Sequence, residues 1–538
     1  MKPYFRHIIA ALIVVICGLF GWWIVRDLKQ SAIRRVTVKP ATERQTKTSP
    51  HLVARSTPAL RDEFRDGTTV EIFGSRLPDE VILRFPSDEA FEAFLYAVEQ
   101  SNIQVVGQLD RLRAVRLRYD DREDLTLLLF GENITTYDSI PSVPSPGPGS
   151  GSTQEGLVGF GNGLLPWLGI TTDHSSWGAG VKIAVLDSGI VPHSDLPGLV
   201  QSIEIVPFPL DLDKTHGHGT AVASLIAGVD DSAPGVAPAA ELISIRISDE
   251  SGQADSFAMA AGILAAVDAD ADLINISMGT SVDNPLIAEA VGYARNHNAL
   301  IVASSGNTEQ SDATYPAAYP SVISVGAVDA RGEHLDFSNY GKFLSVTAPG
   351  YAVNAAWPGN RYKRISGTSA SAPIVTGAIA ATMSNGSGVK MSASQAAEIV
   401  MSHSDEAGIS GPDSEYGVGI LNVGRIMTRG ISGIVDAAIT DQRIVSTGSG
   451  DQIQITIQNR GTAILVNTLL EISTPFGNRQ FNATTLAPGS IQTFTMPIQL
   501  AGFHEDTPIE VYSKLTLGTT GRDITPYNNQ RSDTLYKR

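Results

Sequence analysis

Val181-Lys-Ile-Ala-Val-Leu-Asp187-Ser-Gly189 is a short, mostly apolar run that ends abruptly in an acidic residue and a turn. More short apolar runs follow along the chain, separated by helix-like segments: Leu242–Ile247, Leu273–Ile276, Leu300–Ala303 and Val322–Val325. Such runs, alternating with helices, are typical of buried strands in a parallel sheet. The sequence therefore predicts an α/β domain over residues 157–430, with helices on both faces of a parallel sheet and functional residues at the carboxyl ends of its strands.

The preceding segment, residues 78–140, predicts a smaller α+β unit. Strand-like patterns occur at Glu80–Phe85, Ile103–Val106, Ala114–Leu117 and Ile134–Tyr137. Ser87 is placed to cap a helix after the first strand, and Asp120–Phe130 has the pattern of a second helix. The resulting order, βαββαβ, predicts a ferredoxin-like sandwich.

Two changes of composition separate these units from the rest of the chain. Residues 141–156 begin with Pro141-Ser-Val-Pro-Ser-Pro-Gly-Pro-Gly-Ser-Gly-Ser152, which predicts an exposed linker that is easy to cleave. Helical periodicity disappears in residues 431–538, where alternating stretches such as Leu465–Ile472 predict an all-β sandwich.

The N-terminus predicts a membrane anchor in residues 1–26. Ile8–Val25 is an unbroken apolar stretch of 18 residues, with basic residues on both sides, and this length just spans a bilayer core as a helix. A cleaved signal peptide is the alternative, although no small-x-small cleavage site precedes Arg26. Residues 27–77 are polar, basic and poor in periodic apolar residues, which predicts a flexible stalk.

The charge and cysteine content exclude some classes of protein. The chain has 538 residues and a formal net charge of −17, which argues against a nucleic-acid partner. Residues 1–60 alone carry +8, so the remainder is more acidic than the average indicates. The single cysteine, Cys17, lies in the apolar N-terminal stretch, so the chain has neither an internal disulfide nor a cysteine-ligated zinc site.

Three motifs carry residues suited to nucleophilic catalysis. Asp187 ends a strand, His218 lies between glycines in His216-Gly-His218-Gly, and Ser369 follows Gly-Thr at the start of a helix rich in small residues. Near a helix start an imidazole can stay neutral, as a general base must, and the positive end of a helix favours charge that develops on a serine. Each residue alone also fits a plainer role: a turn residue, a solvated or metal-binding histidine, and a helix cap.

Taken together, D-S-G at 187–189, H-G-T at 218–220 and G-T-S-x-S-x-P at 367–373 resemble the subtilisin family of serine endopeptidases. The resemblance extends over roughly Leu165–Met427, about half of the chain. It implies a subtilisin-like fold and hydrolysis of protein or peptide substrates by this Asp, His and Ser through an acyl-enzyme. The chemistry requires no cofactor. The family often binds structural calcium, but no ligand loop here is specific enough to name, so the metal ligands stay unknown.

Other positions match the motifs with which the family binds substrate. Asn307, in Ala303-Ser-Ser-Gly-Asn307, corresponds to the asparagine that holds the oxyanion. Ser277, Met278 and Gly279 correspond to the segment that binds the substrate backbone as an added strand. Thr314 stands where many members have glycine at the base of the specificity pocket, which implies smaller side chains at P1, the residue before the scissile bond.

The flanking regions also resemble parts of known subtilases. The unit at 78–140 looks like a subtilisin-type propeptide, which implies a self-inhibited precursor with this unit as its intramolecular inhibitor and autocleavage between Ile140 and Leu157. Residues 431–538 resemble adhesion-type β-sandwich modules of extracytoplasmic proteins. The resemblance thus implies a membrane-anchored enzyme whose peptidase domain lies outside the cytoplasm, in the periplasm or at the cell surface, or is secreted after processing.

Two other interpretations stay open at this point. A catalytically silent scaffold would keep the fold only to bind proteins, although all four chemical residues are present. A metallopeptidase that uses His216 and His218 lacks the glutamate that a helical zinc motif has between its histidines.

Overall fold

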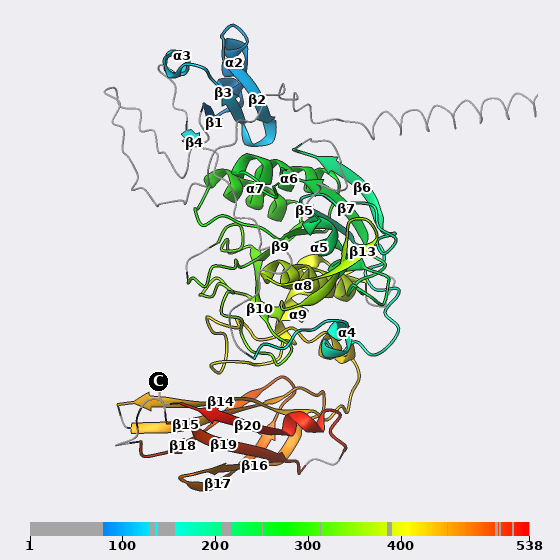
Figure 1. Ribbon diagram of the computed structural model, residues 1–538, viewed down its shortest axis with the longest axis vertical. Coiled ribbons are helices and arrows are strands. Elements are labelled where there is room, and N and C mark those ends of the chain that lie inside the picture. Colours follow the sequence, from blue (N-terminus) through cyan, green and yellow to red (C-terminus); the bar gives the residue numbers. More distant parts are fainter. Residues whose placement is uncertain are drawn as a thin grey trace, which may run out of the picture. The chain divides into compact units, whose positions relative to one another are not determined.

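The structure is a computed structural model of the chain (Figure 1). It describes residues 79–129, 135–137, 156–206, 217–249, 251–311, 314–384, 390–448, 450–500, 504, 507–518 and 521–536. The predicted anchor at 1–26, the predicted stalk at 27–77 and residues 141–155 of the predicted linker lie outside the described residues. No described helix has both the length and the apolar character needed to cross a membrane.

A seven-stranded parallel sheet forms the centre of the α/β domain, with the strand order β11-β10-β9-β8-β5-β7-β6. Every neighbouring pair in it is parallel. The strands are β5 Lys182–Asp187, β6 Leu199–Glu204, β7 Glu241–Arg246, β8 Leu273–Ile276, β9 Leu300–Ser304, β10 Val322–Val328 and β11 Val346–Pro349. The predicted parallel α/β sheet is confirmed.

The two outer strands do not show the apolar run by which the inner strands are recognised. β6 is largely exposed and carries polar residues. β11 is buried, but it has only four residues and includes a threonine and a final proline. An outer strand has a neighbouring strand on one edge only, and its other edge is open. It therefore need not be apolar on both faces.

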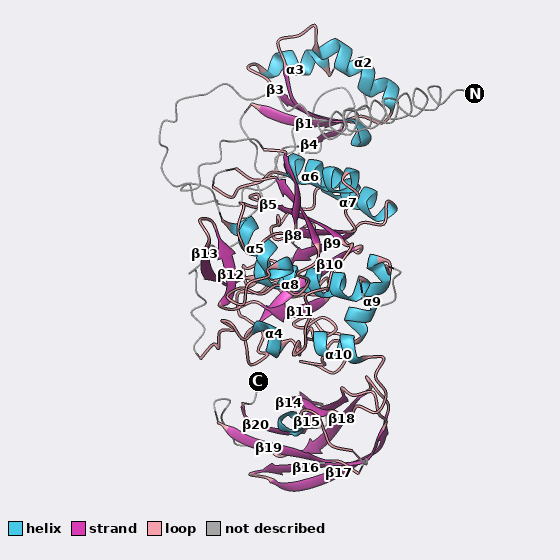
Figure 2. Cartoon of the chain, turned by 90° about the vertical axis from the view of Figure 1, so that its right-hand side faces the viewer, coloured by secondary structure: helices cyan, strands magenta, loops and turns pink. Residues whose placement is uncertain are grey.

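Helices cover both faces of the sheet, as predicted (Figure 2). One face carries α5 His218–Ala227, α8 Thr368–Met383 and α9 Ala393–Ser402, and the other carries α6 Ser256–Asp268 and α7 Pro285–Asn296. Val185 of β5 packs with the first group, and its neighbour Leu186 packs with the second. Successive strand residues point to opposite faces, so one apolar strand supplies both cores.

α5 and α8 are buried along their whole lengths. A helix that is apolar or small-sided all round fits only in the interior of a large domain. The two helices pack against each other. His218 and Ser369 lie in the first turns of these two helices.

The unit at residues 78–140 has the predicted element order. It consists of β1 Glu80–Arg84, α2 Asp88–Val98, β2 Gln104–Leu109, β3 Ala114–Arg118, α3 Arg122–Leu128 and β4 Thr135–Tyr137, and its antiparallel sheet has the order β2-β3-β1-β4. Ser87 caps α2 as expected: its Oγ accepts the N–H of Ala90 at 3.2 Å. Phe91 and Phe94 of α2 pack into the core of this unit.

The C-terminal region is all β apart from the short helix η2 Pro526–Asn529. Its strands are β14 Ala437–Thr447, β15 Gly450–Asn459, β16 Leu465–Thr474, β17 Gly477–Leu486, β18 Ile491–Pro497, β19 Ile509–Thr516 and β20 Gln530–Leu535. They form two antiparallel sheets, β14-β15-β18 and β17-β16-β19-β20, whose apolar side chains share one core. The predicted all-β fold of this region is confirmed.

Short elements complete the described structure. β12 Val353–Trp357 and β13 Arg361–Ile365 form an antiparallel hairpin that precedes α8. The remaining helices are η1 Asp110–Leu112, α4 Leu164–Trp167 and α10 Val423–Thr428.

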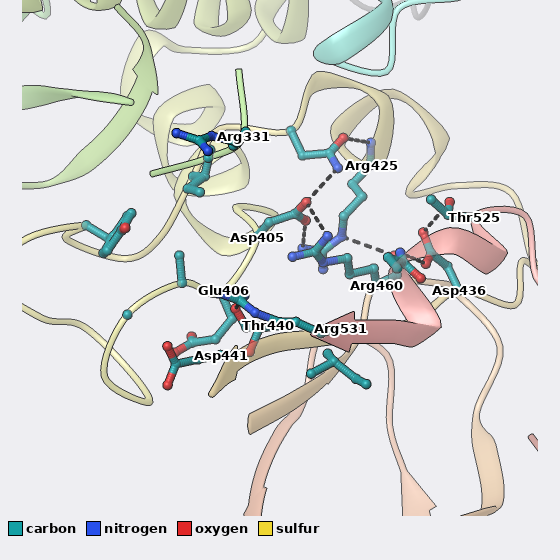
Figure 3. Close-up of a pocket in the computed structure, with 18 of the residues that line it drawn as sticks. Arg331, Asp405, Glu406, Arg425, Asp436, Thr440, Asp441, Arg460, Thr525 and Arg531 are labelled. Carbon is teal, nitrogen blue, oxygen red and sulfur yellow. Dashed lines mark hydrogen bonds and ion pairs between the residues drawn. The ribbon is translucent and has the colours of Figure 1, made fainter. Parts of the chain in front are cut away.

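A buried polar network around Asp405 connects the α/β domain to the sandwich (Figure 3). The Asp405 carboxylate pairs with Arg425 of α10 at 3.0 Å and with Arg460, which follows β15, at 3.1 Å. The N–H of Glu406 donates to Gln458 Oε1 of β15 at 3.0 Å. The side chains of Arg425 and Asp405 are only 8% and 13% exposed, so the connection is built from nearly desolvated charges.

Candidate active site

Asp187 is the last residue of β5, and its side chain is 1% exposed. The N–H of Ser188 donates to its Oδ1 at 2.7 Å. Such a bond favours the ionised form of a buried carboxyl group. The strand therefore ends in a held carboxylate at the carboxyl edge of the sheet, where the sequence places it.

His218 is the first residue of α5, and its Nδ1 lies 2.9 Å from each carboxylate oxygen of Asp187. Gly219 makes this approach of helix and strand feasible. A Cβ at that position would lie 2.5 Å from the carbonyl oxygen of Gly189 and 3.2 Å from Cβ of Asp187. The position after the histidine is therefore restricted to glycine by the space available. The contact at Nδ1 directs the other ring nitrogen, Nε2, away from the carboxylate.

Opposing effects set the pKa of His218. Burial disfavours the imidazolium, but the charge of Asp187 and its hydrogen bond to the ring favour it and together prevail, so the pKa lies above the ordinary 6.5. This direction differs from the expectation that a helix start keeps the imidazole neutral. The reason is that the carboxylate is in direct contact with the ring, and a full charge in contact outweighs the partial charge of a helix end.

Ser369 is the second residue of α8, and it is 2% exposed. Its Oγ donates to the carbonyl oxygen of Ser277 at 3.0 Å, and Ser277 Oγ donates to the carbonyl oxygen of Ser369 at 3.2 Å. Asn275 Nδ2 donates to Ser277 Oγ at 3.0 Å, and Thr376 of α8 donates to Asn275 Oδ1 at 2.9 Å. This chain of bonds ties the start of α8 to the end of β8.

Sequence reasoning missed Asn275 and Thr376. Asn275 is an amide inside the apolar strand Leu273–Ile276, and it is fully buried. A polar residue within a buried strand must find a hydrogen-bond partner, so its presence was the available signal.

Asn307 follows β9 and is oriented by Thr368, a further residue that sequence reasoning missed. Asn307 Oδ1 accepts the N–H of Thr368 at 2.8 Å and its hydroxyl at 3.0 Å. With both bonds on the oxygen, Nδ2 is the atom of this amide that can donate to another group. The position of Thr368 between Gly367 and Ser369 in the serine motif was the signal for such a role.

Ser277, Met278 and Gly279 follow β8, and Gly279 lies beside Thr314. A Cβ at Gly279 would lie 2.6 Å from Thr314 Cγ2, and a Cβ at Gly306 would lie 2.8 Å from Thr314 Oγ1. Asn339 Nδ2 donates to that hydroxyl at 3.0 Å. The threonine side chain therefore fills the space between two segments of backbone.

Of the histidine pair in the metallopeptidase interpretation, His218 contacts Asp187, and His216 lies outside the described residues. Among the residues that are described, no group of three or more His, Cys, Asp or Glu side chains is arranged to hold a metal ion.

Comparison with known proteins finds a match to the model of the subtilase family over residues 178–419. A thermostable alkaline protease of Halalkalibacterium halodurans is 34% identical over 251 residues, which are 46% of this chain and 68% of that protein. Subtilisin Savinase of Lederbergia lenta is 37% identical over 205 residues, 38% of this chain and 76% of the relative. Among solved structures, the prenylagaramide maturation protease PagA is 28% identical and covers 47% of this chain and 94% of its own, with a TM-score of 0.42.

The matched segment contains the end of β5 and the first turns of α5 and α8, which carry Asp187, His218 and Ser369. Identity above 30% extends over more than two thirds of the alkaline protease, so the similarity is not limited to short motifs. The chain belongs to the subtilase family and is a subtilisin-like serine endopeptidase.

Proposed function

We propose that Asp187, His218 and Ser369 are the catalytic triad of this endopeptidase. The observation that carries the proposal is the pair of 2.9 Å contacts between His218 Nδ1 and the Asp187 carboxylate. It is supported by the packing of α5 against α8, because the histidine and the serine lie in the first turns of these helices.

In this mechanism Asp187 holds the imidazole with its Nδ1–H toward the carboxylate, which leaves Nε2 as the base. Nε2 takes the Ser369 proton as Oγ attacks a peptide carbonyl, and the proton then passes to the leaving amine. Water hydrolyses the acyl-enzyme with the same nitrogen as base. Ser369 Oγ donates to Ser277 O at 3.0 Å in the structure, and substrate binding would exchange this bond for one with Nε2.

Asn307 Nδ2 and the backbone N–H of Ser369 would donate to the oxyanion of the tetrahedral intermediate. Thr368 supports this role, because its two bonds to Oδ1 fix the orientation of the amide before substrate binds. Loss of one such donor typically lowers kcat by about 100- to 1,000-fold.

The acyl side of the substrate would pair with Ser277, Met278 and Gly279, with its P1 side chain directed toward Thr314. A β-branched side chain at the base of a pocket leaves less room than glycine, so we propose a preference for small P1 residues. Thr314→Gly should raise kcat/KM for phenylalanine at P1 relative to alanine, measured with peptides that differ only there. An unchanged ratio would remove Thr314 from the pocket.

A fluorophosphonate probe tests the triad, because it bonds covalently to an activated serine. Labelling of the full-length chain, incubated beforehand so that the proposed inhibitory unit can be released, should disappear in Ser369→Ala and persist in Ser371→Ala. Ser371 is a matched control, since it lies two residues later in α8 and donates to the carbonyl oxygens of Ala348 and Pro349 instead. A wild-type chain that takes up no probe would favour the catalytically silent scaffold.

The unit at residues 78–140 is proposed as an intramolecular inhibitor, which makes the enzyme a self-inhibited precursor. Ile82 and Ala114 of its sheet belong to one apolar cluster with Phe257 of α6. Gly107 also approaches this ring, because a Cβ there would lie 2.5 Å from it. Burial of one face of the sheet against the peptidase domain supports a stable complex.

Ion pairs surround this apolar contact and join the unit to α6 and α7: Arg84 with Glu289, Arg111 with Asp268 at 2.7 Å, and Arg116 with Asp255 at 2.6 Å. Asp255 is also the N-cap of α6, where its Oδ1 accepts the N–H of Ala258 at 2.8 Å. Arg116 therefore binds a carboxylate that the peptidase domain already holds in place.

Autocleavage between Ile140 and Leu157 would separate inhibitor and enzyme. Mass spectrometry of the incubated full-length chain should show a new N-terminus in this interval, and Ser369→Ala should stay intact. A wild-type mass that does not change on prolonged incubation of active protein would contradict the precursor proposal.

Localisation is proposed from the N-terminal sequence. Residues 1–26 anchor the protein, residues 27–77 form the stalk, and the peptidase domain works outside the cytoplasm, with release after cleavage of the linker. The full-length chain should then stay in carbonate-washed membranes, whereas a chain that starts at residue 27 should not.

Structural calcium stays possible and would be held by carboxylate and carbonyl oxygens. Asp195 is the strongest candidate ligand, because it is 1% exposed and its Oδ2 has no hydrogen-bond partner. Its Oδ1 already accepts the N–H groups of Val229 and Asp230, and burial raises the pKa of this carboxyl group. Among the described residues, it belongs to no group of three or more His, Cys, Asp or Glu side chains that could hold a metal ion.

A further inference from the structure

The hairpin β12–β13 lies beside α5, the helix that begins with His218 (Figure 2). Its second strand ends at Ile365, and three residues separate it from Ser369. Its first strand is bonded to α5, where the N–H of Ala356 donates to Ser224 Oγ at 2.9 Å. The hairpin is therefore connected to both helices that begin with the candidate histidine and serine.

The tip of the hairpin touches the residue just before His218. A Cβ at Gly217 would lie 2.4 Å from Pro358 Cδ and 2.7 Å from Trp357 Cε2. Glycine is required for such a close approach of ring and backbone. Trp357 and Pro358 thus form a wall against Gly217, the residue that precedes His218.

The hairpin is strongly positive in an otherwise acidic chain. The net charge of the whole chain is −17, yet residues 350–368 contain Arg361, Lys363 and Arg364 and no Asp or Glu. All three cations are exposed. Arg361 donates from Nε to the carbonyl oxygen of Pro358 at 2.9 Å. Among the described residues, neither Lys363 nor Arg364 forms an ion pair with a carboxylate.

Arg361 and Lys363 are both on the same face of the hairpin as Trp357, and Lys363 is the one that contacts the tryptophan ring. In the register of the two strands, Trp357 is opposite Arg361 and Ala355 is opposite Lys363, and paired residues of an antiparallel ladder share a face. The Lys363 ammonium lies 4.2 Å from the centre of the Trp357 ring, a cation–π contact that holds it beside the wall. Arg364 is on the opposite face, because side chains alternate along a strand.

The direction of catalysis places the leaving segment next to this wall. The acyl side of the substrate would run along Ser277–Gly279, which is bonded to Ser369 from the β8 side. The imidazole must reach the leaving nitrogen in order to protonate it. The chain that follows the scissile bond therefore starts on the side of His218, where Trp357 and Lys363 lie.

We propose that Trp357 and Lys363 form a subsite for an acidic side chain on the leaving-group side of the scissile bond. The inference rests on the proposed triad and names a substrate class for it: proteins with Asp or Glu within the first few residues after the cleaved bond. Lys363 supplies the opposite charge, and the tryptophan ring fixes the ammonium and lowers its exposure to water.

Quenched fluorescent peptides test the subsite with the full-length chain, incubated beforehand so that the proposed inhibitory unit can be released. The peptides are built on a bond that the enzyme cuts in denatured casein, and they carry Asp, Asn or Lys at one of the first three positions after that bond. At the best position, kcat/KM should be about three- to tenfold higher for Asp than for Lys, and the ratio should shrink at high salt. Lys363→Gln should abolish the ratio, and Lys363→Glu should reverse it.

Matched controls separate a local subsite from the general charge of the enzyme. Arg364→Glu changes the charge equally one residue away on the other face, and Arg479→Glu does so on the exposed strand β17 of the sandwich. Both should keep the wild-type ratio. A wild-type ratio near one at every position, or an equal change in Arg364→Glu, would overturn the proposal.

An incorrect triad and an incorrect subsite give different results in these experiments. If the wild-type chain cuts no casein bond, or if Ser369→Ala cuts the peptides at the wild-type rate, the triad itself is wrong and the subsite is lost with it. If cleavage depends on Ser369 but ignores the charge of the leaving segment, only the subsite is wrong.

Discussion

Asp187 and Asp405 are both buried carboxylates that face a basic side chain, but their partners differ in kind. Asp187 contacts one imidazole, with His218 Nδ1 at 2.9 Å from each oxygen. Asp405 contacts two guanidinium groups, Arg425 at 3.0 Å and Arg460 at 3.1 Å, and the amide of Asn422 at 3.0 Å.

The difference shows what separates a reactive charge pair from a structural one. Arginine keeps its proton across the physiological pH range, so the two basic partners of Asp405 do not change their charge. Histidine can lose and regain a proton near neutral pH, so the pair at Asp187 has two charge states. Changes at Asp187 should therefore affect turnover, and changes at Asp405 should affect stability.

The largest effect is expected for the nucleophile that the first pair serves. Ser369→Ala should lower kcat by about 10⁶-fold, the magnitude known from subtilisin, without unfolding the protein. Turnover of a peptide and the thermal unfolding curve, measured on the same sample, check both parts. Near-wild-type hydrolysis would end the assignment.

Asp187→Asn breaks the reactive pair while it keeps the size of the side chain. The amide can hold the wrong tautomer of His218, so kcat should fall by about 10⁴-fold, with a small change in Tm. Steady-state kinetics provide the measurement. A fall of less than tenfold would show that the 2.9 Å contacts have no role in turnover.

Asp405→Ala breaks the structural pair and leaves Arg425 buried without its counter-ion. The free energy of unfolding should drop by about 3–5 kcal/mol, while kcat at low temperature stays close to that of the wild type. For the unfolding experiment, Asp405→Ala is best made in the Ser369→Ala background, because self-digestion is then absent.

Lys390→Ala is the control for this stability effect. It removes an ion pair with Asp272 in which the lysine side chain is 42% exposed, and exposed pairs contribute about 0–1 kcal/mol. Equal destabilisation by the two variants would contradict a special role of the buried network.

The smallest effect is a shift in pH dependence. The general base is the neutral imidazole, and contact with Asp187 raises the pKa of His218, so kcat/KM should fall with decreasing pH with a midpoint above 6.5. In Asp187→Asn burial acts alone, and the midpoint should move to lower pH. The stability that the charged pair contributes changes with pH in the opposite direction to kcat/KM. This contribution is fully present below pH 6.5 and is lost as the pH rises through the raised pKa of His218. A midpoint that is the same in both proteins would contradict this origin of the shift.

Local sequence patterns predicted the inner strands well because a buried parallel strand must be apolar on both faces. β5 and β8 are examples, and the polar exception in β8, Asn275, has a partner in Thr376. The same rule failed for β6 and β11, since an edge position relaxes the demand for apolar residues. The motif residues at β5, α5 and α8 were predictable as candidates, but the orienting role of Thr368 was not, because it depends on a contact with Asn307.

By itself, the sequence determined the order of the three folded regions and the residue types available for chemistry, because strand periodicity, helix caps and glycine-flanked motifs act over a few neighbouring residues. Only the tertiary structure decided that Asp187 meets His218, that the pKa of this histidine rises, and that Arg460 of the sandwich closes on Asp405. These outcomes depend on desolvation and on charges brought together from distant parts of the chain, and both arise only when the domains pack.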